Sequence, residues 1–153
     1  MTTTSVREET AVRAVFTEHE QGMRLRSPER IVARYARDAV TCTLAPPLRN
    51  TGLDARDPEA LAGWMAGFSG PITLEHRDLR VAVSGDVAFA HGLARLAAVP
   101  VGYPEGFSMW MRVTVGLRRR EGRWLVVHEH QSVPFHMDGS FLAATDLEPR
   151  ETP

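Results

Sequence analysis

Long runs of alternating apolar and polar residues fill the chain from Ile72 to Val133, and they constrain its fold more than any other feature. Alternation of this kind predicts strands with one buried face. Short turn sequences separate the runs, so successive strands are expected to pair antiparallel. The four predicted strands are ITLEHRDLRVAV, DVAFAHGLARLAAV, FSMWMRVTVGLRR and RWLVVHEHQSV.

Helical patterns come before these strands. Residues 5–25 repeat apolar side chains at three- and four-residue spacing, which places His19 on the apolar stripe of a helix. Ser27 is a good N-cap for a second helix, and Asp57 for a third. A short strand, DAVTCTL, separates the second helix from the third. Helices followed by a long antiparallel sheet predict an α+β fold, with the helices packed on one face of a curved sheet.

Composition limits the class of protein. The 153 residues, with 43% hydrophobic and 24% charged, suit one globular domain over residues 1–153, with an irregular tail from about residue 136. The formal net charge of −1 predicts no nucleic-acid partner and no anionic membrane partner. The single cysteine and the absence of an apolar leader favour a cytoplasmic protein.

The turn between the last two strands decides which side chains face inward. A three-residue loop at 120–122 keeps the apolar residues of both strands on one face, and that face then includes Glu129 and Gln131. His128 and His130 then lie on the opposite face. A two-residue loop would shift the pairing by one and turn the two histidines inward. Because that shift separates the two apolar sets, the three-residue loop is predicted.

The strand DVAFAHGLARLAAV alternates large and small side chains. If its large side faces the core, His91 and Phe89 point inward, toward Glu129 and Gln131. A small-molecule cavity with a few convergent polar groups is therefore expected. Its expected substrate-binding residues are Gln131, Phe89, Met111, Val113, Tyr35 and Trp64.

Three residues of this cavity are the candidate catalytic groups. Glu129 is the candidate proton shuttle, and His91 and His19 are expected to orient it or to polarise a substrate carbonyl. The alternative is a structural carboxylate with two hydrogen-bonded core histidines. No metal and no cofactor are expected. His128 and His130 have the spacing of metal ligands on a strand, with a third ligand available from His76, Glu75 or His136. A dimer face that these histidines share with Arg112, Trp110 and Trp124 is the preferred interpretation.

Three phrases of the sequence resemble those of the nuclear transport factor 2-like superfamily, and of its SnoaL-like and ketosteroid isomerase homologues in particular. They are YARDAV, GDVAFAHG and GRWLVVHEHQSVPF, and they span nearly the whole chain. The resemblance implies a cone-shaped α+β barrel, in which a curved sheet wraps a pocket closed by the helices. It also implies a homodimer through the convex face of the sheet.

The resemblance includes departures at the isomerase's catalytic positions. The general-base aspartate falls at Thr43, the oxyanion-hole tyrosine at His19, and the second acid near residues 113–115. Steroid isomerisation by that route is therefore not expected. The resemblance instead implies isomerisation, cyclisation or hydrolysis of an apolar carbonyl or epoxide substrate. A non-catalytic binding or accessory domain is the alternative, and a structural oligomerisation domain is the third reading.

Overall fold

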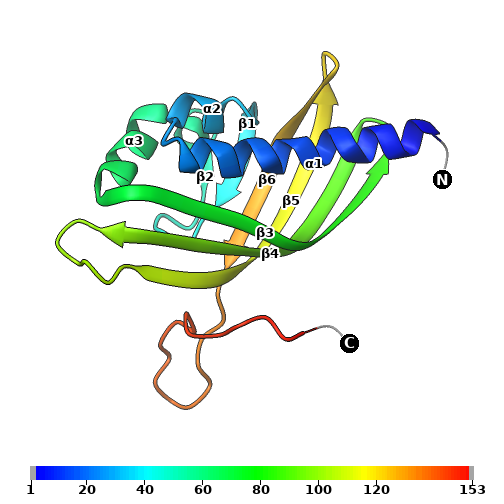
Figure 1. The fold of residues 1–153 in the computed structure, drawn as a ribbon. Coiled ribbons are helices and arrows are strands. Elements are labelled where there is room, and N and C mark those ends of the chain that lie inside the picture. Colours follow the sequence, from blue (N-terminus) through cyan, green and yellow to red (C-terminus); the bar gives the residue numbers. More distant parts are fainter. Residues whose placement is uncertain (1–2, 152–153) are drawn as a thin grey trace.

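The computed structural model describes residues 3–151, and its helices precede most of the sheet, as the sequence predicts. Figure 1 shows the long first helix lying across one face of the sheet, with the shorter helices gathered at one end. The helices are α1 (Thr3–Arg24), α2 (Pro28–Val32) and α3 (Pro58–Ala66), with a short 3₁₀ turn η1 (Asp54–Arg56). The fold is α+β.

One curved, unclosed sheet of six strands forms the other layer, in the order β2-β1-β6-β5-β4-β3. Neighbouring strands pair antiparallel, except that β1 runs parallel to β6. The strands are β1 (Tyr35–Cys42), β2 (Asn50–Thr51), β3 (Phe68–Ser84), β4 (Val87–Pro100), β5 (Phe107–Arg120) and β6 (Arg123–Ser132). The length of β3, β4 and β5 lets the sheet bend around the helices and enclose a hollow.

The apolar stripe of α1 forms the contact between helix and sheet. Its buried members follow the helical repeat and include His19. Val12 and Phe16 pack with the small residues Ala88 and Ala90 and with the β5–β6 hairpin. A second core cluster, at the other end of the sheet, joins the end of α1 to α2 and α3. The cavity described below lies at this second end.

The side of β4 that faces the core is the opposite of the one predicted. Ala88, Ala90 and Ala94 are at most 2% exposed, whereas Phe89 is 50% exposed and His91 is also exposed. Small side chains face inward because α1 packs close to the sheet there, and larger ones would hold the helix away. Size alone was therefore a wrong guide to the buried face.

The β5–β6 hairpin has a two-residue loop and not the predicted loop of three. Glu121 and Gly122 both have positive φ angles, 52° and 76°, as a type I′ turn requires, and Arg120 pairs with Arg123. The pairing of β6 with β5 is therefore shifted by one residue from the predicted pairing, and the other set of side chains in the first half of β6 faces inward. Trp124 and Val126 accordingly face the core.

A β-bulge at Val127 then restores the predicted facing in the second half of β6. Leu117 pairs with Val126, but the preceding residue of β5 pairs with His128, so β6 contains one extra residue at this point. Beyond the bulge Glu129 is buried and His128 and His130 are exposed, as predicted. The prediction of facing is confirmed, although the loop on which it rested was wrong.

The chain after β6 crosses to the side of the sheet away from the helices, as the orange and red segment of Figure 1 shows. One isolated bridge, Phe135 to Ala143, closes a loop in this tail. The indole nitrogen of Trp110 donates to the Glu148 carboxylate at 2.9 Å and fastens the tail to the sheet. Among the described residues, no helix combines the length and apolar character needed to cross a membrane.

Candidate active site

A cavity of about 530 Å³ lies between the three helices and the concave face of the sheet. This volume is in the usual range for small-molecule sites. Most of its wall is apolar, and no arginine contributes to it. The polar or charged side chains of the wall are those of His19, Tyr35, Thr41, Thr43, Asn50, Asp54, Asp57, Trp64 and Gln131.

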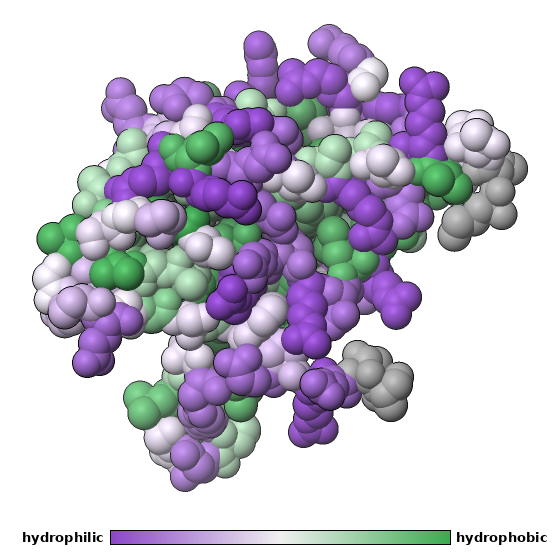
Figure 2. Space-filling view, viewed as in Figure 1, coloured by the Kyte–Doolittle hydropathy of each residue, from purple (hydrophilic) through white to green (hydrophobic). Residues whose placement is uncertain are grey.

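Aromatic residues form one side of the cavity. The rings of Trp64 and Phe68 meet edge to face with centroids 4.9 Å apart, and Phe107 lies 6.1 Å from Phe68. The arrangement follows from α3, because Asp57 caps that helix and the helical repeat then aligns Leu61 and Trp64. Figure 2 shows apolar surface over this end of the molecule, near α3 and the β4–β5 hairpin. The wall suits a flat apolar ligand.

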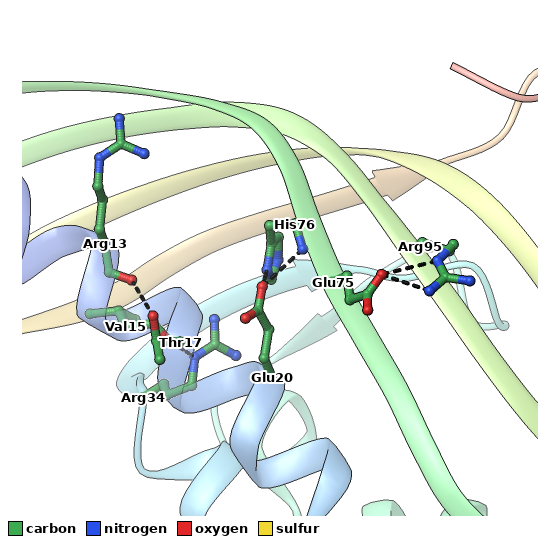
Figure 3. A network of polar contacts seen from close by, with 8 residues as sticks. All are labelled: Arg13, Val15, Thr17, Glu20, Arg34, Glu75, His76 and Arg95. Carbon is green, nitrogen blue, oxygen red and sulfur yellow. Dashed lines mark hydrogen bonds and ion pairs between the residues drawn. The ribbon is translucent and has the colours of Figure 1, made fainter.

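A histidine and a carboxylate pair across the interface of α1 and β3. His76 Nδ1 lies 2.8 Å from Oε1 of Glu20, and the same oxygen accepts the backbone N–H of His76 at 2.9 Å. Figure 3 shows Glu20 reaching from α1 to the ring on β3. The His76 side chain is 7% exposed and that of Glu20 is 26% exposed. The His76 ring is therefore almost completely removed from solvent, whereas the Glu20 carboxylate keeps part of its hydration.

This contact determines which nitrogen of His76 carries the proton. A carboxylate only accepts hydrogen bonds, so Nδ1 of a neutral His76 is the N–H and Nε2 keeps its lone pair. Nε2 has no partner within residues 3–151. Burial lowers the pKa of His76, and the hydrogen bond that Nδ1 donates to Glu20 opposes that shift. His76 is thus a neutral imidazole with a free basic nitrogen.

His19 lies beside this pair and forms part of the cavity wall. Its ring centroid is 6.1 Å from that of His76, and its buried Nδ1 has no hydrogen-bond partner in the described chain. Burial lowers the pKa of His19 well below its usual value, and the positive charge of Arg34 lowers it further. His19 therefore stays neutral and can exchange hydrogen bonds with a bound molecule.

A second set of polar side chains, those of Tyr35 and Gln131, hydrogen-bonds Glu129. The Tyr35 hydroxyl donates to Glu129 Oε2, and Gln131 Nε2 donates to Oε1 at 3.1 Å. Burial and the Glu129 charge raise the pKa of Tyr35, so the phenol keeps its proton. Tyr35 and Gln131 line the cavity, but Glu129, which is 3% exposed, does not. A ligand thus meets the phenol and the amide, with the carboxylate behind them.

Arg34 lies on the other side of Tyr35. Its guanidinium is 5.2 Å from the centre of the Tyr35 ring, and its Nε donates to the Val15 carbonyl at 2.9 Å. The residue is 5% exposed, and its two terminal nitrogens have no partner among the described residues. Arg34 and Glu129 thus place opposite charges close to one phenol, Arg34 over its ring and Glu129 at its hydroxyl.

The structure brings together most, but not all, of the residues singled out from the sequence. Four of the expected substrate-binding residues line the cavity: Gln131, Met111, Tyr35 and Trp64. Val113 is buried in the core beneath it. His91 and Phe89 lie on the exposed outer face, so the expectation that they face the cavity is wrong.

Sequence reasoning missed Glu20 and Arg34, and it considered His76 only as a third metal ligand beside His128 and His130. Glu20 follows His19 directly, but its position in the helical pattern predicts a solvent-facing residue. The face on which His76 lies was hard to predict because β3 contains a bulge between Arg77 and Arg80. A buried arginine has no distinctive pattern in a chain whose 18 basic residues are all arginine. Within residues 3–151 no group of three or more His, Cys, Asp and Glu side chains could hold a metal ion.

The comparisons with known proteins agree with this architecture. The model of the SnoaL-like domain family matches residues 12–136. A crystal structure described as an NTF2-like protein of unknown function, from Pseudomonas putida KT2440, is 34% identical with a TM-score of 0.81. The match covers 95% of this chain and 99% of that one. Among curated proteins, none matches the sequence.

More distant structures share the fold alone. One, provisionally named scytalone dehydratase, from Novosphingobium aromaticivorans, is 15% identical with a TM-score of 0.77, covering 99% of this chain and all of that one. Another is a type 2 hexachlorocyclohexane dehydrochlorinase, 16% identical with a TM-score of 0.68, covering 83% of this chain and 85% of that one.

Proposed function

The chain belongs to the SnoaL-like domain family, and we propose that it is a small-molecule enzyme that removes a proton from a carbon atom of its substrate. The observation that carries the proposal is the contact between His76 and Glu20, a buried imidazole that is held by a carboxylate and lies 6.1 Å, between ring centroids, from the cavity-wall residue His19. The product forms by elimination or isomerisation, depending on whether the substrate carries a leaving group next to that carbon.

His76 is the proton acceptor in this proposal. Its Nε2 carries the lone pair, and Glu20 stabilises the imidazolium that forms when the proton arrives. His19 is less suited to this role, because burial and Arg34 both lower its pKa and no carboxylate contacts it. His19 and Gln131 instead hydrogen-bond the substrate oxygen on which negative charge develops.

Glu129 acts through Tyr35 in this scheme and not on the substrate. It takes the hydrogen bonds of Tyr35 and Gln131, which fixes the positions of two groups that line the cavity. The Tyr35 hydroxyl keeps its proton and orients the substrate. The proposal thus assigns Glu129 a positioning role in place of the catalytic role expected from the sequence.

Two of the related folds support the proposed reaction class. Dehydration and dehydrochlorination, the reactions in the names of those two structures, both remove a hydrogen and a leaving group from adjacent carbons. Either reaction can begin with proton removal by a positioned base. The apolar wall around Trp64 and Met111 supports an apolar substrate.

Hydrogen exchange tests the proposal before the true substrate is known. Aryl ketones with an acidic α C–H, with and without a β-hydroxyl group, are incubated with the protein in D₂O, and proton NMR measures the loss of the α signal. The wild type should accelerate exchange, and His76→Gln should slow it by about 10²–10⁴-fold. His128→Gln, on the exposed face, is the matched control. Equal rates for the wild type and His76→Gln would contradict the assignment of the base.

A further inference from the structure

We propose that the outer part of the cavity recognises a protonated amine, so that the substrate is a flat apolar molecule with one cationic nitrogen. The inference rests on the proposed function only in using the same cavity. It concerns binding selectivity, which the proton-transfer residues do not determine.

The first observation is the charge of the cavity wall. Asp54, on η1, and Asp57, at the start of α3, both contribute to it, and no arginine does. The one histidine in the wall, His19, is neutral because burial lowers its pKa. The wall is therefore negative, and it disfavours phosphates, carboxylates and other anionic substrates.

The second observation is that these carboxylates lack an ion-pair partner within residues 3–151. Neither Asp54 nor Asp57 forms an ion pair there. Asp57 accepts one hydrogen bond, from the backbone N–H of Glu59 at 2.9 Å. Arg56 lies between the two in sequence, but it is not part of the wall. A ligand cation can thus supply the missing positive charge.

The third observation is the aromatic side of the same cavity. Trp64 is about two helical turns beyond Asp57, the N-cap of α3, so the helix aligns an acidic residue with an indole ring. The Phe68 ring contacts Trp64 edge to face, and Phe107 continues the row. Aromatic faces beside carboxylates attract organic ammonium groups, because the ring quadrupole adds to the ionic attraction.

The inner part of the cavity also has an unpartnered polar atom in its wall. The buried Nδ1 of His19 has no partner within residues 3–151, although buried polar atoms are normally hydrogen-bonded. A ligand that extends from His19 to Asp54 would place an oxygen at the inner end and an ammonium at the outer end. The inner end of the cavity would thus bind the oxygen of the ligand, and the outer end would bind its ammonium group.

Three matched probes test the inference by isothermal titration calorimetry. They are 2-naphthylmethylamine, 2-naphthalenemethanol and 2-naphthoic acid, which share one apolar body and differ in charge at neutral pH. The amine should bind about five-fold more tightly than the alcohol at low salt, and the acid should bind most weakly. The preference for the amine should decrease as salt is added, because ions screen exposed carboxylates.

Asp54→Asn and Asp57→Asn identify the source of the preference. Asparagine retains the helix cap at position 57, so both variants should fold. The double variant should bind amine and alcohol equally, whereas Asp78→Asn, which removes a carboxylate outside the cavity wall, should behave as the wild type.

The inference is overturned if the acid binds as tightly as the amine, if the double variant keeps the preference, or if no probe binds at millimolar concentration. Probe binding is measured without proton transfer, so failure of the proton-transfer proposal, which the hydrogen-exchange assay reports, is distinguishable from failure of this one.

Discussion

Glu20 Oε1 accepts two hydrogen bonds from one residue, since both the backbone N–H and Nδ1 of His76 lie within 2.9 Å of it. One carboxylate oxygen on α1 thus fixes both the chain position of β3 and the tautomer of the ring. This double contact makes the pair a rigid unit, in which the basic Nε2 is held in place by the fold itself.

The pH dependence of turnover should report this contact. The proposed base must be neutral, so activity should rise with pH through the pKa of His76, which burial holds below 6.5. Glu20→Gln removes the carboxylate that raises this pKa. The acidic limb of the kcat/KM profile should therefore move to lower pH, while the plateau falls. A limb that stays in place would mean that another group titrates.

Stability should also depend on pH through the buried histidines. The pKa values of His19 and His76 are lowered in the folded state, from a usual value of 6.5. The unfolded chain therefore binds protons first as pH falls below 6.5. The stability that these two neutral rings provide is fully present above that pH and is lost as pH decreases toward their folded pKa values.

Chemical denaturation at pH 7 and pH 5.5 measures this loss. The free energy of unfolding should decrease with falling pH by at most about 1.4 kcal/mol per unit for each histidine. A His19→Gln variant should show a shallower slope, and His130→Gln, on the exposed face, should keep the wild-type slope. Identical slopes for all three proteins would contradict the prediction.

Glu129 and Tyr35 should behave as one unit in catalysis. Glu129→Gln should lower kcat by about 10²-fold or more, and Tyr35→Phe should have a similar effect, because the carboxylate acts through the phenol. The double variant should be little worse than either single one, since residues that act together are non-additive. If the decrease in kcat of the double variant equals the product of the two single decreases, Glu129 acts on the substrate directly.

The close approach of β3 and β4 should make Gly92 sensitive to substitution. A Cβ there would lie 2.9 Å from the Arg77 carbonyl oxygen and 3.1 Å from Leu79 Cα, both backbone atoms. Gly92→Ala should therefore reduce stability by about 1–3 kcal/mol, the usual cost of overpacking. Gly63→Ala is the control, because a Cβ at that helical position meets nothing within 4 Å. It should raise the melting temperature, since alanine favours helix.

The outer face of the sheet should form a homodimer. Val87 and Phe89 are about half exposed on it, and apolar side chains at such a density are typical of interfaces. Sedimentation should give twice the chain mass at micromolar concentration, and Phe89→Glu should give monomers. Leu48→Glu, at a 97% exposed position in the loop between β1 and β2, should leave the dimer intact. A monomeric wild type would contradict the prediction.

The sequence predicted the elements better than their faces. Helices and strands were recognisable because their apolar periodicity extends over many residues. The face of β4 was predicted wrongly, because packing against α1 selected Ala88 and Ala90 over the larger Phe89. The partners of His76 could not be predicted, because they depend on contacts between α1 and β3 that no local pattern records.

The bulge at Val127 gives β6 two halves of opposite parity. Even-numbered side chains face inward before it and odd-numbered ones after it. Deleting Val127 would remove the bulge and leave the second half facing as it does. A regular strand that kept this residue would turn the second half over, so that the imidazoles of His128 and His130 faced inward and the carboxylate of Glu129 and the amide of Gln131 faced outward. The chemistry available to the chamber thus depends on a local irregularity of the backbone and not on residue types alone.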